Sequence, residues 1–213
     1  MAHIFKFDDT SRAISLQREL SSRIVQDDEP GFDPVLFCGM DVAYDEERAY
    51  VSASVWDAHD REFVERARSV GTVATRYAPG FLGFREGPLL VNIKEKLSSK
   101  PDVYLVDGHG FAHPRRFGLA CHFGLAVDRP TVGVAKSFLY GRRAEQRILG
   151  TDGYIIGQII TTSSGKKYYV SVGHRISLTS ATNVVNRCIV DNHPVPLRQA
   201  HLDCNEMKKD RGS

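Results

Sequence analysis

Residues 35–43 restrict the fold of this chain more than any other stretch, because they are nearly all apolar. A strand with one exposed face alternates apolar and polar residues, whereas a continuous apolar run is typical of a strand covered on both faces. Asp41 is the single charged residue in the run. The run therefore predicts a central strand in a sheet that has helices packed on both of its faces.

Two more strands are expected directly after this run. Residues 49–56 alternate apolar with polar or aromatic side chains, and residues 62–73 continue that two-residue period. The connecting segments, 44–48 and 57–60, have the composition of turns. Strands joined in this way pair as an antiparallel meander, so the first three strands are expected to lie side by side.

Helices and strands then alternate along the chain. A helix opening at Pro88 precedes a strand over 103–107, and a helix opening at Pro114 precedes a strand over 131–135, an order that builds parallel strands. The remaining expected elements are an outer helix over 11–26, strands over 154–161 and 167–172, and a helix over 179–190. The expected fold is α/β, a mixed sheet of three antiparallel strands plus parallel strands, flanked by helices.

Composition adds limits on domain number and location. The chain has 213 residues, 42% of them hydrophobic, and no linker-like stretch, so we expect a single domain over 1–204 and a flexible polar tail over 205–213. The four cysteines have no paired spacing and no apolar leader precedes them, which favours reduced thiols and a cytoplasmic protein. No apolar run approaches the roughly 20 residues that cross a bilayer, so no membrane is expected as a partner.

The charge is concentrated locally. The formal net charge is +2, but residues 115–147 contain seven Lys or Arg against two acids, a balance of 7 − 2 = +5. A solvated basic face is one explanation of this segment, and contact with phosphate groups is the other.

Three carboxylates lie where apolar elements end or begin. Asp41 lies in the first strand, Glu86 just before the helix at Pro88, and Asp107 at the end of the strand over 103–107. Each alone has an ordinary explanation as a turn or cap residue, but ligands of open α/β sheets bind at the carboxyl ends of strands. Together the acids predict a shared divalent cation, Mg²⁺ or Mn²⁺ with oxygen ligands, suited to metal-assisted hydrolysis of a phosphodiester.

Histidines and glycines add weaker signals. His109 and His113 have the spacing of helical zinc ligands, but the glycines around them indicate a loop, which argues against zinc. His122 is placed on a face of the second helix distinct from its core face, either as a surface residue or as part of a site. The glycine-rich segments 80–83 and 108–110 are either simple turns or places where a flat ligand approaches the backbone.

Several motifs together resemble the endonuclease V family, an inosine-directed nuclease family with an RNase H-like fold. The F-R-E-G-P and D-G-H-G-x-A-H-P-R blocks are the most specific of them. The similar segments are residues 40–44, 77–88, 107–115, 118–124, 133–141 and 196–201.

The resemblance implies an enzyme that cuts the second phosphodiester bond 3′ to inosine in DNA or RNA, leaving 3′-hydroxyl and 5′-phosphate ends, with Mg²⁺ as cofactor and Mn²⁺ as a substitute. The implied metal ligands are Asp41, Glu86, Asp107 and His201, and the implied catalytic residues are Asp41, Glu86 and Asp107 with Lys136 and His122 beside the scissile phosphate. The implied substrate-binding residues are Tyr77, Pro79 and Gly80 of a duplex-opening wedge, Leu82, Gly108, Gly118, Leu119 and Leu139 of a base pocket, and His113 and Arg115. A monomer is expected.

One departure and two alternatives stay open. The wedge of the family commonly reads Pro-Tyr-Ile-Pro, whereas residues 76–79 read Arg-Tyr-Ala-Pro, and this smaller wedge leaves the preference for duplex or single strands undecided. One alternative is an RNase H-like nuclease for branched or hybrid nucleic acid, which would cut inosine and adenosine strands alike. The other is a non-catalytic inosine-binding module, which would not cleave in Mg²⁺.

Overall fold

The structure of the chain is a computed structural model that describes residues 2–46, 48–72 and 78–210. The strands are β1 (Leu36–Tyr44), β2 (Arg48–Asp57), β3 (Glu62–Thr72), β4 (Val103–Val106), β5 (Thr131–Ala135), β6 (Arg142–Ala144), β7 (Arg147–Leu149), β8 (Ile155–Thr161), β9 (Lys167–His174), β10 (Ile189–Val190) and β11 (His193–Pro194). The helices are the 3-10 helix η1 (Ala2–Phe5) and the α-helices α1 (Thr10–Ser21), α2 (Leu82–Lys94), α3 (Leu119–Val127), α4 (Leu178–Arg187) and α5 (Val195–Lys209).

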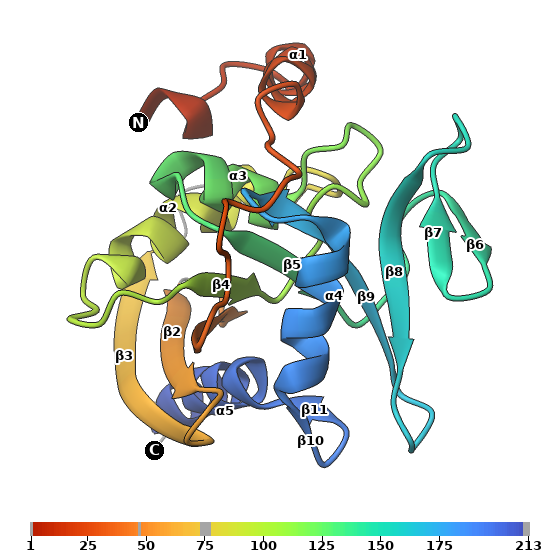
Figure 1. Cartoon of the computed structure of the whole chain (residues 1–213). Helices are drawn as coiled ribbons and strands as arrows, with labels where there is room; N and C mark the ends of the chain where they lie inside the picture. Colours follow the sequence, from red (N-terminus) through yellow and green to blue (C-terminus); the bar gives the residue numbers. More distant parts are fainter. Residues whose placement is uncertain (1, 47, 73–77, 211–213) are drawn as a thin grey trace.

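Nine strands of the described chain form one mixed sheet in the order β3-β2-β1-β4-β5-β9-β8-β7-β6 (Figure 1). The first three strands are an antiparallel meander, and β4 and β5 run parallel to β1. This arrangement confirms the expected α/β fold with its antiparallel and parallel strands. The parallel part brings the carboxyl ends of β1, β4 and β5 to one edge of the sheet.

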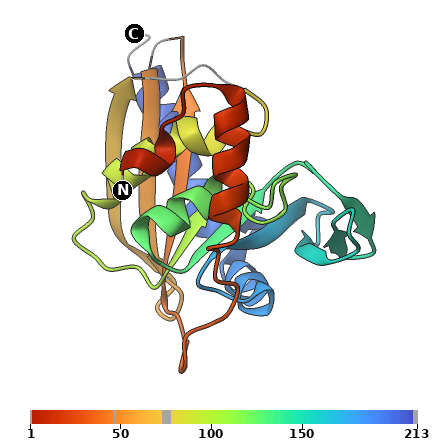
Figure 2. The same ribbon diagram turned by 90° about the horizontal axis from the view of Figure 1, so that it is seen from above.

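Helices cover both faces of the sheet, as the apolar run over 35–43 predicts. Figure 2 shows η1, α1, α2 and α3 in front of the sheet and α5 behind it. Met40 packs with the α2 and α3 side chains Ile93 and Phe123, whereas Phe37 packs with Val184 of α4 and Leu197 of α5. No helix in the described residues combines the length and the apolar character that crossing a membrane requires.

The contact between β1 and α5 positions one wall of the candidate site. A Cβ atom on Gly39 would lie 2.2 Å from the backbone carbon of Pro196, so α5 approaches the sheet this closely only because Gly39 has no side chain. Side chains alternate along a strand, which places Asp41 on the same face of β1 as Gly39. Residues of α5 one to two turns after Pro196 therefore lie beside Asp41.

The helix α2 begins earlier than the sequence predicts, and the helix α3 begins later. The helix α2 begins at Leu82 and contains Pro88, which removes one backbone donor without ending the helix. Glu86 consequently lies inside α2 and not before it. The helix α3 begins at Leu119, and the segment after Pro114 is irregular, because Gly118 is the N-cap residue of the helix.

The other differences concern the ends of three helices and two hairpins. The outer helix α1 ends at Ser21 and α4 ends at Arg187, both earlier than expected. Neither the hairpin β6–β7 nor the hairpin β10–β11 was expected from the sequence. The prediction of a flexible tail from residue 205 is wrong for 205–209, which belong to α5. Cys204 is buried and Lys208 Nζ donates to the carbonyl of Tyr44 at 2.5 Å, so this end of α5 is held against the sheet.

Candidate active site

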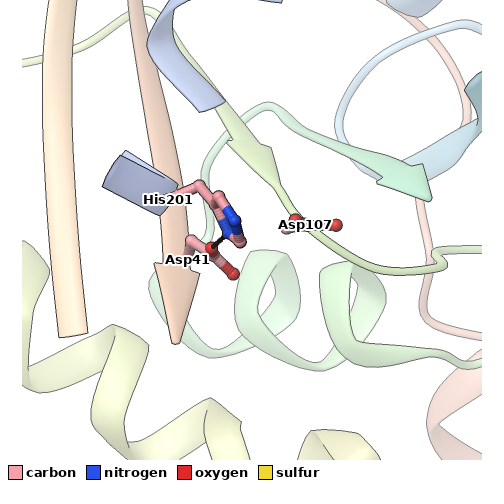
Figure 3. Close-up of side chains that lie close together, drawn as sticks. All are labelled: Asp41, Asp107 and His201. Carbon is pink, nitrogen blue, oxygen red and sulfur yellow. Dashed lines mark hydrogen bonds and ion pairs between the residues drawn. The ribbon is translucent and has the colours of Figure 1, made fainter. Parts of the chain in front are cut away.

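Asp41, Asp107 and His201 come together at the carboxyl edge of the parallel strands (Figure 3). Asp41 lies in β1 and Asp107 directly follows β4, where its N–H donates to the carbonyl of Met40 at 3.1 Å and continues the parallel pairing. His201 comes from α5, and its Nδ1 lies 2.8 Å from Asp41 Oδ2. One potential ligand atom from each residue lies within 4.8 Å of the other two. The predicted meeting of Asp41 and Asp107 is therefore observed.

Two basic side chains, Lys136 and His201, contact the carboxylates of Asp107 and Asp41. Burial raises the pKa of the Asp107 carboxyl, and the nearby carboxylate of Asp41 raises it further. Lys136, which follows β5, places Nζ 2.5 Å from Asp107 Oδ2. The hydrogen bond to Asp41 raises the pKa of His201. Two close, partly buried carboxylates thus have a strong electrostatic preference for a cation between them.

Glu86 lies close to this group but outside its innermost set. It is 7% exposed, and burial raises its pKa to about 8, to which the charges of Asp41 and Asp107 contribute. Among the described residues, the set of ligand atoms within 4.8 Å of one another does not include Glu86. Its role as a metal ligand stays a prediction.

The donor set fits a divalent cation. Two carboxylates are hard oxygen ligands of the kind that Mg²⁺ and Mn²⁺ prefer, and an imidazole nitrogen is better suited to Mn²⁺ than to Mg²⁺. A bound cation would take over the charge compensation that Lys136 supplies to the carboxylates. Asp41, Asp107 and His201 would hold it, with Glu86 next to them.

A cavity of about 280 Å³ adjoins the carboxylates. Asp107 and Lys136 belong to its wall, so the cavity and the candidate metal site are continuous. Seven of the residues expected to bind substrate line this one cavity: Gly80, Leu82, Gly108, His113, Gly118, Leu119 and Leu139. Four of the motif segments, 77–88, 107–115, 118–124 and 133–141, therefore meet around a single cavity.

Arg115 lies behind the cavity wall. Its guanidinium donates to the carbonyl of Gly80 at 2.7 Å and to Gln17 Oε1 at 2.5 Å. Gln17 in turn donates to the carbonyl of Gly80 at 3.0 Å, and His113 Nε2 lies 3.2 Å from the same oxygen. Gly80 has a φ of +79°, a conformation that favours glycine, and these three side chains hold it in place.

Three further expectations have different outcomes. Tyr77 lies outside the described residues. Pro79 is exposed and is not part of the cavity lining.

His122 is fully buried, and its Nε2 lies 2.6 Å from the carbonyl of Ile4 while its ring stacks on Phe5. A ring enclosed in this way cannot contact a phosphate, so the prediction that His122 lies beside the scissile bond is wrong. The N-terminal segment covers the face of α3 that the sequence left to solvent.

Buried histidines predict a pH-dependent stability. Burial lowers the pKa of His122 to about 4, that of His113 to about 3 and that of His109 to about 4. The unfolded chain protonates these rings from about pH 6.5 downward, so the free energy of unfolding should fall by up to about 1.4 kcal/mol per pH unit for each histidine between pH 6.5 and 4. Urea denaturation at about pH 7, 6 and 5 measures this slope.

A matched pair of variants assigns part of that slope to His122. His122→Gln keeps a donor for the carbonyl of Ile4 but does not titrate, so its slope should be shallower than that of the wild type. His59→Gln alters an 85% exposed side chain and should leave the slope unchanged. Equal slopes in all three proteins would contradict the assignment.

Sequence reasoning did not assign five residues of the cavity wall to the site: Gln17, Gly83, His109, Ala135 and Ser137. Gln17 could have been found, because it lies on the buried face of α1 with Ala13, Leu16 and Leu20, where an amide needs hydrogen-bond partners. Gly83 and His109 lie in the glycine-rich segments 80–83 and 108–110, which gave a weak signal. Ala135 and Ser137 carry no such signal, since only the fold brings them to the cavity.

Comparison with known proteins places these features in one family. The family model for Endonuclease V matches residues 18–202. Similar curated proteins include Endonuclease V of Gloeobacter violaceus, 40% identical over 94% of this chain and 87% of that protein, and Endonuclease V of Desulfurococcus amylolyticus, 36% identical over 89% and 90%.

Solved structures agree with that match. The crystal structure of human ENDOV has a TM-score of 0.87 and 31% identity, covering 96% of this chain and all of that one. Endonuclease V from Ciona intestinalis, solved with a DNA that contains an inosine followed by a ribo-adenosine, has a TM-score of 0.85 and 26% identity, covering 93% and 98%.

Proposed function

Because the chain belongs to the endonuclease V family, we propose that it is a metal-dependent endonuclease that recognises inosine in nucleic acid and hydrolyses the second phosphodiester bond on its 3′ side. The products are a 3′-hydroxyl and a 5′-phosphate end. The working cation is Mg²⁺, with Mn²⁺ as a substitute.

One observation carries the proposal: Asp107 belongs both to the carboxylate group and to the cavity wall, and its ion-pair partner Lys136 also lines the cavity. When a base occupies the cavity, the backbone of its strand passes the carboxylates within one or two nucleotides of that base. The same site can therefore read a base and cut a nearby phosphodiester, which agrees with cleavage displaced from the recognised nucleotide.

The cavity offers donors to a keto oxygen. Leu82 and Gly83 begin α2, Leu119 begins α3, and all three line the cavity. The first N–H groups of a helix have no partner within the helix, so both helix starts present donors. Hypoxanthine has a keto oxygen where adenine has an amine, and an amine facing unpaired donors is rejected strongly. The cavity therefore favours inosine over adenosine.

The side chains have separate roles in the hydrolysis. Asp41, Asp107 and His201, with Glu86 beside them, would hold the cation, which would supply an activated water and charge neutralisation at the phosphate. Lys136, which pairs with Asp107, would place its ammonium near a phosphate oxygen. Gln17, His113 and Arg115 keep Gly80 at the mouth of the cavity, and so orient the base.

Matched oligonucleotides test the proposal. End-labelled DNA and RNA strands that differ only in inosine, adenosine or guanosine at one position are incubated with Mg²⁺, Mn²⁺ or EDTA, as single strands and as duplexes. We expect cleavage of inosine strands at the second bond and none in EDTA. Equal cleavage of adenosine strands would favour the general RNase H-like nuclease, and inosine binding without cleavage in either metal would favour the binding module.

A further inference from the structure

A second cavity, of about 420 Å³, adjoins the carboxylate group through His201. Lys136 belongs to the walls of both cavities, Asp107 lines the first and His201 the second. We propose that this second cavity binds the nucleotide on the 3′ side of the cleaved bond, the one that carries the 5′-phosphate of the product. The inference rests on the proposed function and adds a binding site to it.

The path of the substrate follows from the positions of the two cavities. The ligand atoms of Asp41, Asp107 and His201 lie within 4.8 Å of one another, so the cation site stands at the boundary between the cavities. A strand whose base occupies the first cavity, and whose phosphate reaches the boundary, continues past Lys136 and His201. The next nucleotide then lies at the second cavity.

The wall of the second cavity suits a sugar and one face of a base. Its floor consists of Val134 and Leu197, which are 1% and 5% exposed, and of Pro194. Leu202 is 51% exposed and forms part of the rim. An apolar part of the substrate that covers the exposed Leu202 gains free energy from burying that side chain.

The rim of the second cavity is positively charged. Arg198 is exposed, and within the described chain it has no hydrogen-bond acceptor or ion-pair partner. Lys166 Nζ lies 2.8 Å from His193 Nε2, and the charges of Lys166, Arg198 and Lys136 all lower the pKa of His193 in addition to its burial. Arg198 and Lys136 line the cavity and Lys166 contacts its wall at His193, so the rim offers basic side chains to a phosphate.

The helix α5 contains both His201 of the carboxylate group and Arg198 of the proposed binding site. Arg198 and His201 are three residues apart on α5 and therefore lie on the same face of that helix. Leu197 and Leu202 flank the same surface. The close contact of α5 with Gly39 fixes this helix against β1, so Arg198 has a defined position relative to the carboxylates.

Two inosine DNA strands of different length test the proposal. The short strand ends with the phosphate of the second bond 3′ to inosine, and the long strand continues by one nucleotide that carries its own 3′-phosphate. Binding is measured by fluorescence anisotropy in EDTA, so no cleavage occurs. We expect the wild type to bind the long strand about tenfold more tightly, the gain that a charge-assisted contact and a covered apolar surface supply.

Variants of Arg198 assign that gain. Arg198→Ala should remove most of it and leave the affinity for the short strand unchanged, and Arg198→Lys should restore part of it. Arg129→Ala is the matched control, because Arg129 is exposed and precedes β5 at the opposite end of the parallel strands. It should bind both strands as the wild type does.

Equal affinity of the wild type for the two strands would overturn the inference, and so would an Arg198→Ala variant that loses affinity for both strands equally. Adenosine strands of the same lengths separate this failure from that of the proposed function. A wild type that prefers inosine but gains nothing from the extra nucleotide has the base cavity without the second site. A wild type with no preference for inosine contradicts both proposals.

Discussion

Replacing Asp107 with asparagine should reduce inosine-dependent cleavage by about 10³-fold or more, and the folded protein should be at least as stable as the wild type. Asparagine preserves the shape of the side chain but removes the charge that a cation requires. Burial and the carboxylate of Asp41 already disfavour that charge, so its removal relieves repulsion, although the ion pair with Lys136 is lost. Single-turnover cleavage in Mg²⁺ and urea denaturation measure the two effects.

The same substitution elsewhere provides the control for this prediction. Asp128→Asn changes a 64% exposed carboxylate that pairs with Arg175 and follows α3. Its φ of 53° is one that asparagine tolerates, so cleavage should be unaffected. Asp41→Asn should behave as Asp107→Asn does, because Asp41 has the other carboxylate of the group. Titration with Mn²⁺ should show weaker binding in both site variants, and near-native turnover in either would contradict the metal assignment.

The part of the site that the sequence predicts correctly depends on local patterns. The apolar run around Asp41 indicates a buried strand, and the strand before Asp107 is indicated by four apolar residues. Neighbouring parallel strands end at the same edge, so the proximity of the two acids follows from strand order alone. Glycine-rich motifs indicate some segments of the cavity wall. Only the resemblance to a known family assigned these segments to one pocket.

The part that the sequence does not predict depends on contacts between distant segments. His122 has the spacing of an exposed helix position, yet Ile4 and Phe5 of η1 cover it, and no pattern within α3 indicates that cover. The position of His201 depends on how closely α5 approaches Gly39. Pro88 suggests the start of a helix because proline favours the first turn, whereas the packing of α2 carries the helix through it.

Gly118→Ala should destabilise the protein by about 3 kcal/mol or more and abolish cleavage together with the fold of the cavity. A Cβ atom there would lie 2.3 Å from the carbonyl oxygen of His109 and 2.8 Å from that of Gly110. Neither oxygen can retreat freely, because they accept hydrogen bonds from Ala120 and Gly118 at 3.1 and 3.0 Å. Gly118 is therefore required by backbone packing, a reason independent of any contact with a base.

Gly108→Ala separates that effect from base recognition. Its Cβ atom would lie 3.3 Å from Cδ2 of Leu119, the end of a flexible side chain, so the fold should lose less than about 1.5 kcal/mol. The added methyl group narrows the cavity that both residues line, and affinity for inosine strands should fall about tenfold while the thermal midpoint stays near that of the wild type. If Gly118→Ala instead kept its thermal midpoint and lost only the preference for inosine, Gly118 would contact the base directly, and the loop carbonyls would be more mobile than their hydrogen bonds imply.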